Sequence, residues 1–143
     1  MTKIHKEIKV DAPVHQVFAF MADPERLLEI WPSMIEVEDL KPLPTGGTDY
    51  KWQYKMAGMK FRGKSHTTEF VEDRRHVVET KGGIDSKFIW EYSPEQDGTR
   101  VSLTTDYEVP KDLLGKLAKP FILKQNEREA ETILSNLKSR LEA

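Results

Sequence analysis

The chain has 143 residues, of which 38% are hydrophobic and 32% charged, and its net charge is −2. These values are typical of one globular domain, predicted to span residues 1–143, and they do not favour a DNA-binding protein. The absence of cysteine excludes disulfides, thiolate catalysis and cysteine-based metal sites. The sequence contains neither a signal-peptide pattern at its start nor a run of 18 apolar residues, so a cytoplasmic protein is expected.

The N-terminal segment predicts one strand followed by two short helices. Residues 4–10 alternate between apolar and polar side chains, which is typical of a strand with one buried face. Apolar residues then recur at helical spacing over residues 14–21. Asp23 is a good N-cap and Pro24 a good first residue for a second helix, which Pro32 ends.

The middle of the chain predicts six consecutive antiparallel strands. Apolar residues alternate with polar ones, and Gly, Pro and Asp mark the turns. A two-residue turn at Ala57 and Gly58 would place Trp52 opposite Gly63. A later turn over residues 72–75 would pair Thr67 with Thr80, Glu69 with Val78 and Val71 with His76. The predicted strands lie near residues 34–40, 50–56, 59–71, 76–80, 88–92 and 101–109.

The C-terminal segment predicts a short helix over residues 112–118 and a long helix over residues 120–141, separated near Pro120. The long helix would extend about 30 Å and needs a broad surface to cover. A curved antiparallel sheet provides such a surface, so we predict an α+β fold in the order β-α-α-β6-α. The predicted apolar face of the long helix contains Leu123, Asn126, Ala130, Ile133, Leu134, Leu137 and Leu141.

Several short motifs lie in a characteristic order along the whole chain. They are IKVDAP at 8–13, DPERL at 23–27, Trp31 and DGTRV at 97–101. With these motifs the chain resembles the START-like (SRPBCC) superfamily, and in particular its polyketide cyclase/dehydrase-type group with a Bet v 1-like fold. This resemblance implies a helix-grip fold, in which about seven strands wrap around the C-terminal helix and leave a ligand-binding cavity. It implies neither a cofactor nor a particular catalytic residue.

The inward-facing strand positions are rich in aromatic residues. They form either a filled core or the wall of a cavity for a hydrophobic ligand. Glu69 is predicted to face inward, where loss of hydration would raise its pKa and suit it to act as an acid, a base or a ligand anchor. The alternatives are a one-residue bulge that turns Glu69 outward, or an ion pair with a helix cation. The predicted ligand-binding residues are Trp52, Tyr54, Phe61, Glu69, Trp90, Tyr92 and Tyr107.

The four histidines show no metal-ligand spacing, so no metal site is predicted. The outward face of residues 50–65 instead carries an unusual concentration of cations. These cations either keep an exposed strand pair soluble or contact an anionic membrane or RNA. The residues concerned are Lys51, Lys55, Lys60, Arg62 and Lys64.

Three functional hypotheses follow. The first, which we favour, is a carrier or binding protein for a lipid, quinone or polyketide-like molecule. On this hypothesis the protein is not an enzyme. The second is a cyclase/dehydratase-type enzyme in which Glu69 or a tyrosine moves protons. The third is an interaction protein that contacts a membrane, a ribosome or RNA through its basic outer face.

Overall fold

The computed structural model describes residues 2–56 and 58–142. Within them, seven strands form one antiparallel sheet in the order β1-β7-β6-β5-β4-β3-β2, which confirms the predicted α+β fold. The strands are β1 (Thr2–Val10), β2 (Met34–Pro42), β3 (Thr48–Met56), β4 (Met59–Val71), β5 (Arg75–Lys81), β6 (Ser86–Glu95) and β7 (Gly98–Tyr107). The helices are α1 (Val14–Met21), α2 (Pro24–Leu27), α3 (Lys111–Leu114) and α4 (Lys119–Glu142).

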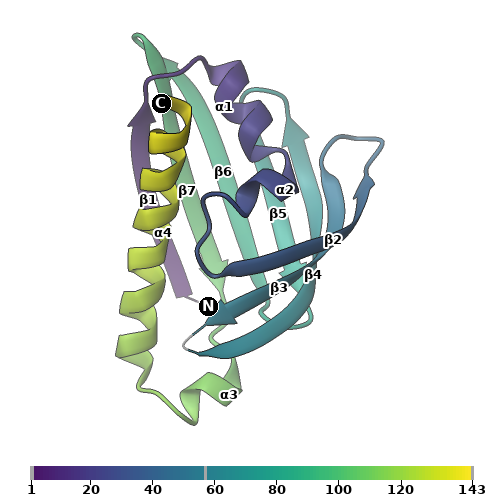
Figure 1. The fold of residues 1–143 in the computed structure, drawn as a ribbon, viewed down its shortest axis with the longest axis vertical. Coiled ribbons are helices and arrows are strands. Elements are labelled where there is room, and N and C mark those ends of the chain that lie inside the picture. Colours follow the sequence, from purple (N-terminus) through teal and green to yellow (C-terminus); the bar gives the residue numbers. More distant parts are fainter. Residues whose placement is uncertain (1, 57, 143) are drawn as a thin grey trace.

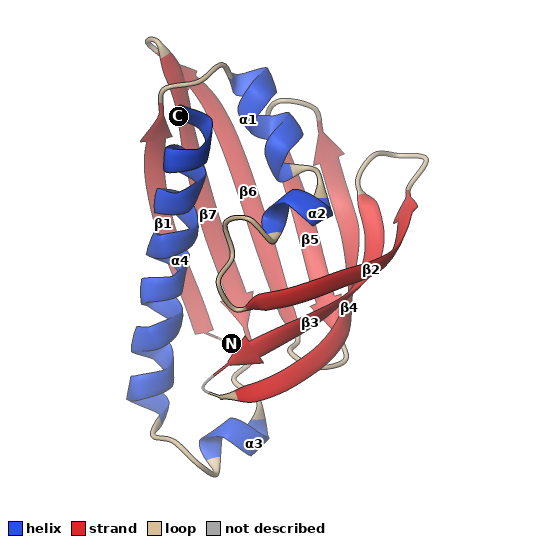
Figure 2. Ribbon diagram, in the orientation of Figure 1, coloured by secondary structure: helices blue, strands red, loops and turns tan. Residues whose placement is uncertain are grey.

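The helices cover one face of the curved sheet. The long helix α4 lies along β1 and β7, whereas α1 and α2 lie over the upper part of the strands in the middle of the sheet (Figures 1 and 2). The short helix α3 lies at the opposite end, next to the start of α4 (Figure 1). Among the described residues, no helix combines the length and hydrophobicity needed to cross a lipid bilayer.

Local sequence signals explain where the short helices begin. The side chain of Asp23 accepts a hydrogen bond from the Glu25 backbone amide at 3.1 Å, and Pro24 occupies the first position of α2. Helix α1 follows Pro13 and buries Val17 and Phe18. Both helices therefore bring apolar side chains to the concave face of the sheet.

The predicted pairing of β3 with β4 is confirmed. Met56 pairs with Met59, and Trp52 pairs with Gly63, as counting outward from a two-residue turn predicts. A Cβ added to Gly63 would lie 2.5 Å from Cζ2 of Trp52, so the glycine makes room for the indole ring. Ala57 of the predicted turn lies outside the described residues.

The predicted pairing of β4 with β5 is wrong. Thr67 pairs with Val78 but Glu69 pairs with Val77, so a β-bulge shifts the register between Thr67 and Glu69. The turn over residues 72–74 contains Asp73 with φ 62°, a left-handed conformation that aspartate tolerates better than most residues.

The interior contains two apolar clusters. The α1 cluster joins α1, α2, Trp31, parts of β6 and β7, and the C-terminal half of α4. The α3 cluster joins residues of β3 with Ile84, Tyr107, Leu113 and Ile122. The partly buried side chains Ile4 and Tyr54 pack against both clusters.

Candidate functional site

A cavity of about 110 Å³ lies between the sheet, the Trp31 segment and α4. An engineered protein cavity of about 150 Å³ can hold benzene, whereas ordinary ligand pockets measure about 300–1,000 Å³. This space is smaller than either, so a ligand larger than a small ring requires side chains to move. The aromatic part of the lining consists of Trp31, Tyr50, Trp52, Tyr54, Phe70, Phe88, Trp90 and Tyr107.

Four predicted ligand-binding residues, Trp52, Tyr54, Trp90 and Tyr107, line this cavity. Two others lie outside the lining formed by the described residues. Phe61 is partly buried against the α3 cluster, and Tyr92 is buried in the α1 cluster. The structure therefore brings together a subset of the predicted residues, and their role in ligand binding stays a prediction.

The predicted inward placement of Glu69 is wrong. The bulge in β4 turns Glu69 outward, where its side chain is 45% exposed. Its carboxylate accepts a hydrogen bond from Arg75 Nε at 2.5 Å, and the same guanidinium binds Glu91 at 3.0 Å. Its partner is therefore a cation on the neighbouring strand rather than one on the helix. Phe70 takes the inward position, and the centroid of its ring lies 5.2 Å from that of the Phe18 ring.

A different carboxylate, Glu129 of α4, lines the cavity. It accepts hydrogen bonds from Ser33 Oγ at 2.5 Å and from Tyr54 Oη at 3.1 Å. Burial and the nearby charge of Glu129 raise the pKa of Tyr54, which keeps this hydroxyl protonated as a donor. The sequence signal for Glu129 is its spacing, three residues after Asn126 and four before Ile133 on the inward face of α4.

A row of hydroxyl-bearing residues crosses the sheet and forms part of the cavity lining. Each member pairs with the next on the neighbouring strand, and all five are buried. Thr80 hydrogen-bonds Ser86, and Asn126 of α4 donates to Tyr107 Oη at 2.9 Å. Sequence reasoning missed this row because the predicted register of β4 and β5 paired Thr80 with Thr67 instead of Ser65. The members of the row are Tyr50, Ser65, Thr80, Ser86 and Tyr107.

Several buried polar atoms around the cavity have no hydrogen-bond partner among the described residues. They include Nε1 of both Trp31 and Trp52, and Nδ1 of His76, and all three residues line the cavity. Burial lowers the pKa of His76 to about 4, so its imidazole is neutral at pH 7. Unpaired buried polar groups are costly, and a ligand with oxygen atoms could pair with them.

The other three histidines, unlike His76, lie on the surface. His5 contacts Thr104, His66 contacts Asp49, and His15 contacts Asp73. The last pair, together with Glu72, is the one grouping of possible metal ligands among the described residues. It is an exposed acidic group such as many proteins carry without a metal.

The predicted basic outer face has the predicted arrangement. Lys55 pairs with Lys60 and Lys51 with Lys64 across β3 and β4, and Arg62 lies between them. All five cations are exposed. Lys51 binds Asp39 at 3.0 Å, whereas the other four have no ion pair within residues 2–56 and 58–142.

The family model described as "Polyketide cyclase / dehydrase and lipid transport" matches residues 1–142. The chain belongs to this family. Its members include proteins of the polyketide cyclase and lipid transport types, which agrees with a cavity between sheet and helix. No curated protein matches the chain.

Solved structures share the fold over almost the whole chain. A protein of Thermus thermophilus is 27% identical with a TM-score of 0.76, and the match covers 98% of this chain and 97% of that one. A START superfamily protein of Mycobacterium smegmatis is 16% identical, with a TM-score of 0.82 and coverage of 98% and 97%. The Zhui aromatase/cyclase of a Streptomyces species is 18% identical, with a TM-score of 0.80 and coverage of 99% and 93%.

Proposed function

We propose that this protein binds a hydrophobic small molecule in the cavity between the sheet and α4, as a carrier or binding protein. The observation that carries the proposal is a mostly apolar cavity that also presents a few polar groups. Such a combination is what small-molecule sites require, because apolar walls supply affinity and polar groups supply orientation. The family membership supports the same class of ligand.

The polar groups define what the ligand carries. The indole N–H groups of Trp31 and Trp52 are donors without partners among the described residues, so they suit carbonyl or hydroxyl oxygens. Glu129 can accept a hydrogen bond from a ligand hydroxyl. The ligand we propose is therefore an apolar ring or chain with oxygen substituents, as in quinones, polyketide-like molecules and oxygenated lipids.

Native mass spectrometry of the freshly purified protein tests the proposal directly. We expect a bound small molecule that organic extraction releases and identifies. Titration with the fluorescent probe anilinonaphthalene sulfonate provides a second readout. Replacing Trp52 by Ala should weaken probe binding, because the indole forms part of the cavity wall. Ile35→Ala, at an exposed position outside the cavity lining, is the matched control. Equal binding by wild type and Trp52→Ala would contradict this site.

The contact between Glu129 and Tyr54 favours a second candidate, a cyclase/dehydratase-type enzyme. In this proposal the Glu129 carboxylate removes a proton from a carbon next to a carbonyl group, and the Tyr54 hydroxyl donates a hydrogen bond to the oxygen. Glu129 thereby takes the role first predicted for Glu69. Turnover of a poly-β-ketone should be lost in Glu129→Gln and kept in Glu69→Gln. Full turnover by a folded Glu129→Gln variant would exclude this mechanism.

A further inference from the structure

Two large apolar side chains are exposed at the α3 end of the molecule. Leu114 of α3 is 44% exposed, and Phe121 in the first turn of α4 is 51% exposed. The adjacent residues Leu113 and Ile122 are fully buried in the α3 cluster. The segment therefore has one apolar side packed on the protein and further apolar groups in contact with water.

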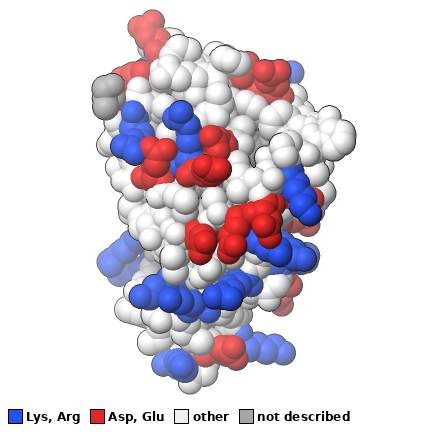
Figure 3. Space-filling view, turned by 45° about the vertical axis from the view of Figure 1, so that its right-hand side comes forward, with Lys and Arg blue, Asp and Glu red and all other residues white. Residues whose placement is uncertain are grey.

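Lysines surround these apolar side chains. Residues 110–125 contain four lysines against one aspartate, a net charge of +3 in a chain whose total is −2. All four lysines are exposed and have no ion pair within residues 2–56 and 58–142. Blue side chains predominate on the lower part of the face in Figure 3, below a group of acidic side chains. The four residues are Lys111, Lys116, Lys119 and Lys124.

This arrangement is unfavourable in water alone. The first turn of α4 contains no acidic residue, although the positive end of the helix dipole favours one there. The lysines near this end add to the positive potential, and exposed Leu114 and Phe121 lose the stabilisation that burial provides. A partner that is both anionic and apolar would offset all of these costs.

We infer that the segment over residues 110–125 docks on the surface of an anionic lipid bilayer. Leu114 and Phe121 enter the boundary between headgroups and acyl chains, and the four lysines contact lipid phosphates and carboxylates. Basic segments with exposed apolar side chains bind membranes in this way. RNA would satisfy the lysines but would leave Leu114 and Phe121 in water.

The β3–β4 hairpin extends the same surface. Met56, the last residue of β3, belongs to the α3 cluster, and Met59, the first residue of β4, packs against it. The outward residues beside them are Lys55 and Lys60. Met56 also lines the cavity, next to Tyr107 and Asn126. Docking through this end would thus place the nearest wall of the cavity beside the lipid. The inference concerns the membrane contact alone, and it does not depend on ligand binding in the cavity.

Flotation with vesicles tests the inference on the full chain. We expect binding to vesicles of equal parts phosphatidylcholine and phosphatidylserine at low salt, weak binding at high salt, and no binding to pure phosphatidylcholine. The double variant Lys116→Glu, Lys119→Glu should bind at least about tenfold more weakly, because the loss of each lysine near an anionic surface weakens binding several-fold. Leu114→Ser with Phe121→Ser should also lose binding at low salt.

The matched control is Lys41→Glu with Arg74→Glu, which changes the net charge equally at exposed positions away from α3. It should bind as the wild type does. All substituted positions are exposed, and circular dichroism verifies that each variant is folded. Wild-type binding by the Leu114, Phe121 variant would overturn the inference. So would a loss of binding confined to Lys60→Glu with Lys64→Glu, which would place the contact on the β3–β4 face.

Discussion

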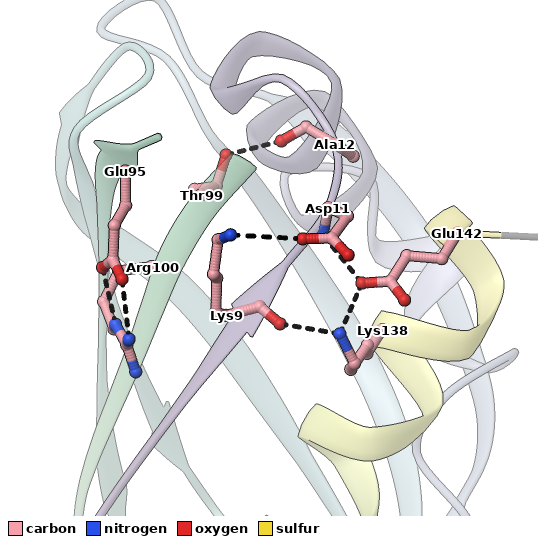
Figure 4. Close-up of polar contacts among 8 residues, drawn as sticks. All are labelled: Lys9, Asp11, Ala12, Glu95, Thr99, Arg100, Lys138 and Glu142. Atoms are coloured by element: carbon pink, nitrogen blue, oxygen red, sulfur yellow. Dashed lines mark hydrogen bonds and ion pairs between the residues drawn. The ribbon is translucent and has the colours of Figure 1, made fainter. Parts of the chain in front are cut away.

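The two ends of α4 are held in different ways. The C-terminal half buries Ile133, Leu134 and Leu137 in the α1 cluster. Polar contacts add to this packing, because Lys138 Nζ donates to the Lys9 carbonyl oxygen at 3.1 Å and to Glu142 at 2.6 Å (Figure 4). Glu142 also accepts a hydrogen bond from the Asp11 backbone amide at 2.7 Å.

The N-terminal end has much less to hold it. Of its first turns, only Ile122 is fully buried, and Phe121 and four nearby lysines face the solvent. One helix thus combines an anchored end with an end held by one fully buried side chain, the Asn126–Tyr107 hydrogen bond and an exposed ion pair between Glu127 and Lys6. Local stability follows buried apolar contacts, so we expect the cavity to open most easily at the α3 end.

The largest expected effect is on packing at the anchored end. Leu137→Ala removes a fully buried side chain and should lower the free energy of unfolding by about 2–5 kcal/mol. Phe121→Ala, at the other end, should change it by less than about 0.5 kcal/mol, because that ring is exposed. Urea denaturation measures both. Equal losses in the two variants would show that the two ends of α4 do not differ.

A smaller effect concerns pH and the α1 end, where His76 packs against Phe18 and Tyr92. Burial lowers the His76 pKa from 6.5 to about 4 in the folded state, so the unfolded chain binds a proton that the folded chain excludes. The free energy of unfolding should therefore fall as pH drops from about 6.5 to 4, by roughly 3 kcal/mol in total. Below that window both states are protonated and the fall ends.

Urea denaturation across this pH range checks the His76 prediction. His76→Phe keeps an aromatic ring but cannot titrate, so its stability should lose this part of the pH dependence. The control His15→Phe changes an exposed histidine and should keep it. An unchanged pH profile in His76→Phe would rule out burial of the neutral imidazole as the cause.

The smallest effect concerns the polar contacts drawn in Figure 4. Lys138 and the Asp11 amide lower the Glu142 pKa, so the stabilisation is present above the usual carboxyl pKa and is lost as pH falls. Glu142→Gln should slightly lower the Tm at neutral pH, and the difference from wild type should vanish in acid. Glu38→Gln, at an exposed position, is the control. A difference that persists in acid would point to packing instead of charge.

The sequence by itself determined the order and type of the elements. Alternation over residues 50–56 and a short turn were enough to place Trp52 opposite Gly63, because counting outward from a regular turn needs no distant information. The same reasoning located the basic outer face. The motifs at 8–13, 23–27 and 97–101 further placed the chain in its superfamily.

Only the tertiary structure decided which carboxylate faces the cavity. Alternation of the side chains allowed Glu69 to face inward or, with a one-residue bulge, outward, and the structure contains the bulge between Thr67 and Glu69. The rotation of α4 that brings Glu129 to Tyr54 depends on packing against the whole sheet. The hydroxyl row exists only once five strands lie in register. Short-range periodicity specifies which face of a segment is buried, whereas the position of one face against another depends on contacts between distant residues.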